Sequence, residues 1–304
     1  MTPAALGLLL VAAMLHATWN YWAKRAGGGL PFVFLTGLVI CAAYVPAVAV
    51  YWFLKRPGLP WAGAAGVMFV SGALKTGYSL YLQRGYRAGD FSLIYPLARG
   101  TGPLLSTLAA VALLGERPPP AALAGGLVII AGIFWLTGGT RWLGRGRAAA
   151  GASAGGEEAA RMRGLAARYG VMSGVFIASY TLWDRHAVAG WLLPPLLYDA
   201  GTSFTQVALL TPFAWRRRAE VAREWREHRL NAFCVGLFSP ASYVLVLTAM
   251  TFTPVSYVAP AREVSIIIGA FFGAKLLNEA DARRRIVAAA VMAAGIALLV
   301  GGSR

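Results

Sequence analysis

Residues 98–139 read ARGTGPLLSTLAAVALLGERPPPAALAGGLVIIAGIFWLTGG, and residues 261–302 repeat this pattern at a constant offset of 163. The offset pairs Arg99 with Arg262 and also holds upstream of the quoted stretch. Further pairs are Glu116 and Glu279, Gly7 and Gly170, Thr18 and Thr181, and Gly27 and Gly190. Self-similarity at one fixed offset predicts a chain that is built from two related halves.

The composition is that of a membrane protein. Hydrophobic residues make up 58% of the 304 residues and charged residues only 13%, which excludes a soluble globular domain. A hydrocarbon core of roughly 30 Å needs about 20 helical residues. Apolar stretches of that length are 4–23, 31–54, 61–83, 91–114, 120–139, 164–184, 190–214, 230–250, 254–277 and 286–302. We therefore predict an all-α polytopic membrane protein with ten transmembrane helices.

Five helices in each half have a topological consequence. An odd number makes the second half enter the membrane from the opposite side, so the two repeats are inverted relative to each other. We expect a first repeat over 1–139, a flexible linker over 140–163 that is rich in Gly, Ala and charge, and a second repeat over 164–304. Inverted repeats predict a substrate cavity between them, near the middle of the bilayer.

The net charge of +16 invites a nucleic-acid interpretation, but its distribution argues against one. Of the 28 Lys and Arg residues, 19 fall in alternate loops and only 5 in the opposite loops and the C-terminus. This bias is the positive-inside pattern of a plasma (cytoplasmic) membrane protein, and it predicts a cytoplasmic linker and external termini. The few His and Cys residues lie far apart in sequence, so we expect no metal and no cofactor.

Ionisable side chains within the apolar stretches are the strongest functional candidates, because each is costly in hydrocarbon without a partner or a water-filled cavity. They are Lys75, Arg99, Asp199, Arg262 and Glu263. Two further residues, Asp184 and Lys275, are expected at the ends of their stretches, where headgroups or water can reach them.

Three of the buried candidates are cations and two are acids, which favours an anionic or zwitterionic substrate. We predict that Arg99 and Arg262 bind its carboxylate or phosphonate, since a guanidinium holds such groups in a fork. The alternative is structural, with Arg262 paired to Asp199 and Arg99 bound to backbone carbonyls.

Other side chains are candidates for the wall of the cavity. They are His16, Trp19, Asn20, Tyr78, Tyr95, Trp183, Tyr243 and Tyr257. Aromatic faces suit a ligand with an apolar or cationic part; the alternative is that each only packs between helices or anchors at the interface. The acid Asp199 has no neighbouring cation in sequence, so it is the candidate for proton coupling, or else a permanent ion-pair partner of Arg262 or Lys75.

Small residues mark the fifth and tenth stretches as closely packed scaffold helices, for example Ala121 with Gly125 and Ala290 with Ala294. We expect Glu116 to cap the helix that follows it. Ser71, Ser203 and Gln206 fit hydrogen bonds between helices without any ligand.

Four short motifs, together with the offset of 163, resemble an EamA-type member of the drug/metabolite transporter superfamily. They are His16-Ala-Thr-Trp-Asn20, Tyr95-Pro-Leu-Ala-Arg99, Leu114-Gly-Glu116 and Arg262-Glu263-Val-Ser265. The resemblance implies a secondary transporter for small metabolites, with four helices of each half around a central cavity and the fifth as scaffold. Many relatives have cytoplasmic termini, which disagrees with the charge bias of this chain.

Three functions fit these patterns. A secondary transporter of a small organic metabolite is favoured by the repeat and the buried charges, and no Walker motif for ATP-driven transport is present. An intramembrane aspartyl-protease-like enzyme is the alternative from another class, but Gly89-Asp90 and Tyr198-Asp199 match its motifs poorly, and we expect no enzyme. A membrane-embedded small-molecule sensor is the third. The expected partners are the bilayer, a small-molecule substrate and protons, with the chain as a monomer or weak homodimer.

The charge bias makes a prediction about orientation. In a variant lacking Cys41 and Cys234, a cysteine at Ser153 should resist an impermeant thiol reagent in intact cells and react after permeabilisation. A cysteine at Gly58, in a loop predicted to be external, is the matched control and should react in both. Labelling of the Ser153→Cys protein in intact cells would contradict this orientation. It would place the linker outside, together with the basic loop at 215–229 that is predicted on the same side.

Overall fold

Helices account for the regular structure of the part of the chain that the computed structural model describes, which comprises residues 1–26, 29–58, 61–88, 91–136, 155–265, 268 and 282–301. Within these ranges there is no β-strand. The prediction of an all-α chain is confirmed.

The offset of 163 carries helices of the first repeat onto helices of the second. It moves α2 (Leu30–Lys55) onto α8 (Pro195–Trp215), and α5 (Pro120–Leu136) onto α12 (Ala282–Gly301). The repeat that is read from single residues is therefore also a repeat of secondary structure.

The helices group into two compact units, and each unit takes helices from both repeats. The α1–α9 unit comprises residues 2–76 and 183–253, and the α5–α12 unit comprises residues 77–182 and 254–304 with Met1. The division falls inside two long helices, α3 (Trp61–Ala88) and α7 (Gly155–Arg185).

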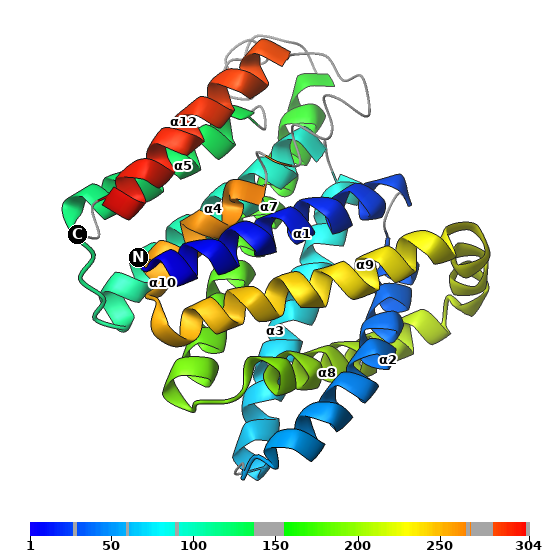
Figure 1. The fold of residues 1–304 in the computed structure, drawn as a ribbon. Helices are drawn as coiled ribbons and strands as arrows, with labels where there is room; N and C mark the ends of the chain where they lie inside the picture. Colours follow the sequence, from blue (N-terminus) through cyan, green and yellow to red (C-terminus); the bar gives the residue numbers. More distant parts are fainter. Residues whose placement is uncertain are drawn as a thin grey trace. The chain divides into compact units, whose positions relative to one another are not determined.

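In the α1–α9 unit, α1 (Pro3–Arg25) lies along α9 (Arg218–Phe252), and α2 packs on α9 and α8 (Figure 1). Two side chains of α9 donate hydrogen bonds to carbonyls of α1. Ser242 Oγ bonds to the Ala12 oxygen at 2.8 Å, and Asn231 Nδ2 bonds to the Trp22 oxygen at 2.9 Å. Such polar bonds between helices stabilise association where neighbouring lipid is as apolar as the side chains.

Two elements differ from the sequence-based prediction. The prediction of a loop over 215–229 is wrong, because a turn at Arg216 and Arg217 is followed directly by α9. This helix bends at His228, whose φ is −129°. Likewise α7 begins at Gly155, so residues 155–163 of the expected linker are helical. Both segments are rich in Ala, Glu and Arg, which favour helix regardless of whether lipid surrounds them.

By length and apolar composition alone, three of the described helices are long enough to cross a bilayer, at Pro3–Ala23, Leu30–Lys55 and Arg218–Phe252. Two shorter apolar helices lie at Pro120–Ile133 and Ala290–Leu299.

In the α5–α12 unit, α12 packs closely along α5, as the small residues of both stretches predicted (Figure 1). A Cβ atom added to Gly125 would lie 2.5 Å from the Leu299 backbone nitrogen and 2.6 Å from the Gly295 carbonyl oxygen. The two backbones are therefore in contact at this point, with no side chain between them.

A short helix of the same unit, α10 (Val255–Ala261), packs on α4 (Phe91–Leu113) and α5. The Glu116 carboxylate accepts hydrogen bonds from the backbone N–H groups of Val255 and Ser256, at 2.8 and 2.9 Å. This carboxylate caps the N-terminus of α10, where two N–H groups lack partners within the helix. The helix that Glu116 caps thus belongs to the second repeat, whereas the sequence suggested the next helix along the chain.

The contact between α5 and α12 predicts opposite effects for adjacent glycines. Gly125→Ala should lower the melting temperature, because overpacking against backbone atoms costs about 1–3 kcal/mol. Gly126→Ala is the matched control, since its added Cβ would meet Pro260 Cγ at 3.6 Å and Cβ at 3.8 Å, which are ordinary contacts. Replacing Gly by Ala inside a helix is otherwise stabilising by roughly 0.5–1 kcal/mol. Thermal unfolding in detergent measures both, and equal melting temperatures would contradict the close contact.

Candidate functional site

The first candidate site lies in the α1–α9 unit, where one buried cation faces two carboxylates. Lys75 extends from α3, and its Nζ lies 3.2 Å from Oδ1 of Asp199 on α8 and 3.5 Å from Oδ2 of Asp184 near the end of α7. The three side chains are 14%, 7% and 0% exposed, respectively. We call these three residues the Lys75 cluster.

Asp184 is held by hydroxyl groups as well as by the ammonium. Its Oδ1 accepts hydrogen bonds from Ser71 Oγ at 2.5 Å and Tyr198 Oη at 2.6 Å, and its Oδ2 accepts one from Tyr243 Oη. Three O–H donors stabilise the negative charge of this carboxylate in a place that bulk water does not reach.

Asp199 has a different set of donors. Its Oδ2 accepts a hydrogen bond from Tyr44 Oη at 2.5 Å, and its Oδ1 accepts one from Lys75 Nζ. The same Nζ donates to Thr202 Oγ1 at 3.1 Å and lies 4.5 Å from the centre of the Tyr243 ring, a cation–π distance. The ammonium is thus surrounded by acceptors from several helices.

The three side chains of the Lys75 cluster together carry one more negative than positive formal charge, since one ammonium faces two carboxylates among the described residues. An uncompensated charge is expensive in a buried site. The arrangement therefore suits the binding of one further positive charge, either a proton or a cationic group.

The second candidate site lies in the α5–α12 unit, where two cations face one carboxylate. Glu263 Oε1 lies 3.2 Å from Nε of Arg262, and its Oε2 lies 3.5 Å from Nη1 of Arg99 on α4. The Glu263 side chain is 1% exposed and the two arginines 11% and 12%. We call these three residues the Glu263 cluster.

The backbone is irregular at this cluster. The α-helix α10 ends at Ala261, and a single 3₁₀ turn, η3 (Arg262–Val264), follows it. Pro260 lies at the end of α10 and removes a backbone donor there. Short 3₁₀ turns are common at the ends of α-helices.

Six of the predicted site residues come together in these clusters. Lys75 and Asp199 meet in the first, where the Tyr243 ring lies beside the ammonium, and Arg99, Arg262 and Glu263 meet in the second. Within these clusters, Arg262 bonds Glu263, and Asp199 bonds Lys75.

The structure shows other contacts for the remaining predicted residues that it describes. Asn20 Nδ2 bonds to the His16 carbonyl one turn back at 2.7 Å, and the His16 and Trp19 rings lie 4.7 Å apart. Trp183 Nε1 donates to the Val67 carbonyl at 2.8 Å. The other three are Tyr78, which contacts the Tyr180 ring, Tyr257, which is buried in α10, and Tyr95, whose side chain lies outside the described part.

The sequence analysis missed Asp184, Tyr44, Tyr198 and Thr202. Placing Asp184 at an exposed span end was wrong, since its side chain is fully buried. The repeat could have predicted this burial, because the offset of 163 maps Asp184 onto Tyr21, which lies within the first apolar stretch. Asp184 therefore lies within a helical stretch, where Ser71 and Tyr198 can reach it.

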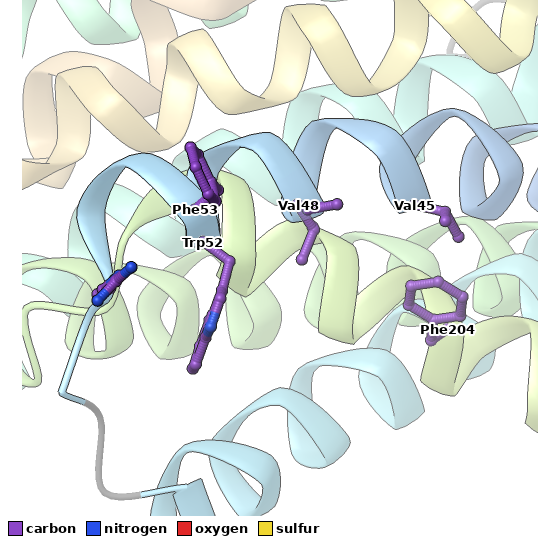
Figure 2. A pocket seen from close by; sticks show the side chains of 7 residues that line it. Val45, Val48, Trp52, Phe53 and Phe204 are labelled. Carbon is purple, nitrogen blue, oxygen red and sulfur yellow. The ribbon is translucent and has the colours of Figure 1, made fainter.

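An apolar groove of about 750 Å³ runs along α2 of the α1–α9 unit, with Phe204 of α8 on its other side (Figure 2). It is lined by Val45, Val48, Ala49, Trp52, Phe53, Arg56 and Phe204. Its exposed aromatic side chains suit lipid chains, and none of the predicted site residues is among the described residues that line it.

Comparison with known proteins identifies the family. The EamA-like transporter family matches residues 3–138 and 165–301, one match for each repeat. A crystal structure titled "Crystal structure of protein" is similar with a TM-score of 0.71 at 19% sequence identity, covering 97% of this chain and 98% of that one, which supports the fold. No curated protein matches the chain. The two family matches span both repeats of an all-α polytopic membrane protein, and the chain belongs to the EamA-like transporter family.

Proposed function

We propose that the chain is a secondary active transporter that moves a small organic metabolite, anionic or zwitterionic, across the cytoplasmic membrane by alternating access. The observation that carries this proposal is the Glu263 cluster, in which repeat-related Arg99 and Arg262 face a single carboxylate. A transporter must bind its cargo within the membrane and release it again, so guanidinium groups buried within apolar stretches are fitting groups to bind an anion.

The substrate's anionic group binds between Arg99 and Arg262 in this proposal. Guanidinium groups bind carboxylates and phosphonates through two parallel hydrogen bonds, and their low exposure strengthens the attraction relative to water. Amino acids, phosphonates and organic acids carry the required group.

The Lys75 cluster supplies the coupling site in this proposal. Neutralising one of its two carboxylates removes its excess negative charge, and a proton is the smallest ion that does so. The proposal assigns this proton to Asp199, because Asp184 is fully buried and already accepts three O–H hydrogen bonds, whereas Asp199 retains slight exposure. Binding and release of this proton in turn on the two sides would couple a pH gradient to transport.

A flux assay in proteoliposomes separates this function from its alternatives. A panel of amino acids, phosphonates and organic acids is first screened for ligands that raise the melting temperature, since a bound ligand stabilises by mass action. Uptake into vesicles of a ligand found in this screen supports the transporter function. Tight binding without uptake would favour a sensor, and cleavage of a peptide by the same preparation would favour an enzyme.

The arginine pair yields a testable prediction. Arg99→Lys keeps the charge but loses the planar fork, so affinity for the screened ligand should fall about tenfold. Arg99→Ala and Arg262→Ala should bind more weakly still. The exposed Arg226→Ala is the matched control and should bind as wild type. Unchanged affinity in both buried alanine variants, with folding verified by chromatography and melting, would remove the anion site.

The coupling site yields a second prediction. Asp199→Asn should abolish accumulation driven by a pH gradient but retain exchange of substrate between the two sides, because its amide cannot carry the proton. Asp184→Asn is the contrasting variant and should lower stability by about 3–5 kcal/mol, as expected when a buried ion pair is broken. Normal gradient-driven uptake by folded Asp199→Asn protein would exclude Asp199 from coupling.

A further inference from the structure

The chain between the apolar parts of α8 and α9 is strongly basic, and the proposed function does not use it. Residues 216–229 contain six arginines and three glutamates, which leaves a formal excess of three positive charges. In the structure they form a turn at Arg216 and Arg217 and the first turns of α9. We call residues 216–229 the basic segment.

The length of α9 places this segment outside the hydrocarbon core. At 1.5 Å per residue the 35 residues of α9 extend for about 52 Å, whereas the core is roughly 30 Å thick. The helix bends at His228, where the chain turns from the long part of α9 towards the end of α8 (Figure 1). Residues 229–252 alone extend for about 36 Å and can cross the core, so the basic segment lies at the headgroups or beyond them.

Five of the six arginines have side chains that are available to a partner. The exception is Arg226, whose Nε donates a hydrogen bond to the Ala222 carbonyl at 3.3 Å. The other five make no hydrogen bond or ion pair with any described residue, and all but Arg217 are fully exposed; they are Arg216, Arg217, Arg218, Arg223 and Arg229. The side chain of Glu224 lies beside His228, with Oε1 3.9 Å from Nε2. The positive charge of the segment therefore faces its surroundings.

Exposed apolar side chains adjoin the basic segment at both of its ends. Trp215, at the end of α8, directly precedes Arg216, and Leu230 of α9 directly follows Arg229. Both boundaries lie at the same face of the membrane, because the chain leaves the core through α8 and returns to it through α9. Tryptophan is enriched where hydrocarbon meets headgroups, so Trp215 marks the level at which the arginines begin.

We infer that the basic segment binds the headgroups of anionic phospholipids, with their acyl chains against the exposed apolar side chains of α8 and α9. A lipid phosphodiester carries one negative charge and oxygen acceptors that suit guanidinium groups. A lipid matches this surface better than a soluble anion does, because it brings a phosphate and an apolar chain to the boundary together. The inference does not depend on the substrate proposed above.

Two lipids with identical acyl chains test the inference. Full-length protein in neutral detergent is titrated with dioleoylphosphatidylglycerol, which is anionic, or dioleoylphosphatidylcholine, which is zwitterionic, and apparent dissociation constants are measured by thermal shift. Wild type should bind the anionic lipid about tenfold more tightly or better. The triple variant Arg218→Gln, Arg223→Gln, Arg229→Gln should lose about tenfold or more of that affinity but retain its affinity for the zwitterionic lipid.

A matched control removes three positive charges elsewhere. Lys55, Arg117 and Arg168 are exposed cations outside the basic segment, and their joint replacement by glutamine should leave the affinity for phosphatidylglycerol unchanged. An equal loss of affinity in this control would show a general effect of net charge and overturn the inference.

Three further outcomes would contradict lipid binding at this segment. They are equal affinity of wild type for the two lipids, undiminished phosphatidylglycerol binding by the triple variant, and competition by glycerol phosphate as strong as that of the intact lipid. The last outcome would show a site for a soluble anion, since glycerol phosphate has the headgroup chemistry without acyl chains. If the triple variant does not fold, Arg223→Gln alone should lower the affinity for phosphatidylglycerol about three- to fivefold, and an unchanged affinity would overturn the inference.

Discussion

The ammonium of Lys75 ties three helices together, because a single cation on α3 faces carboxylates on α7 and α8. In a region that water scarcely reaches, each of these charges is tolerable only near the others. The hydroxyl groups of Ser71, Tyr44 and Tyr198 then turn towards the carboxylates. The arrangement of the side chains around Lys75 in the α1–α9 unit follows from the requirement to compensate one positive charge and two negative charges.

The Glu263 cluster obeys the same requirement with the signs reversed. Two guanidinium groups share one carboxylate, and the backbone departs from α-helical geometry at the residues involved. Each unit thus contains a cluster of buried charged side chains that come from more than one helical element. Buried charges are costly within a membrane and are typical of binding and coupling sites, which is the physical reason to relate the clusters to transport.

The sequence predicted the helices and the repeat well, because a bilayer demands long apolar helices and a duplication leaves residues such as Arg99 and Arg262 in register. It also identified Lys75, Asp199 and Glu263 as buried charges. The sequence did not reveal which side chains bind these charged groups. Asp184 adjoins Arg185, so local polarity suggested a helix boundary, and only the fold shows that Ser71 and Tyr198 surround it. Likewise, helical spacing does not reveal that Glu263 faces Arg99, because side-chain directions change where α10 gives way to a 3₁₀ turn.

The Glu116 carboxylate, which bonds to the first N–H groups of α10, comes from the other repeat. A single repeat made alone would therefore lack the group that completes its own short helix, and these donors would have to find another acceptor. Two copies placed in opposite orientations could each supply the missing carboxylate to the other. In the present chain the two repeats are covalently linked, so the carboxylate and the helix that it completes are always present together.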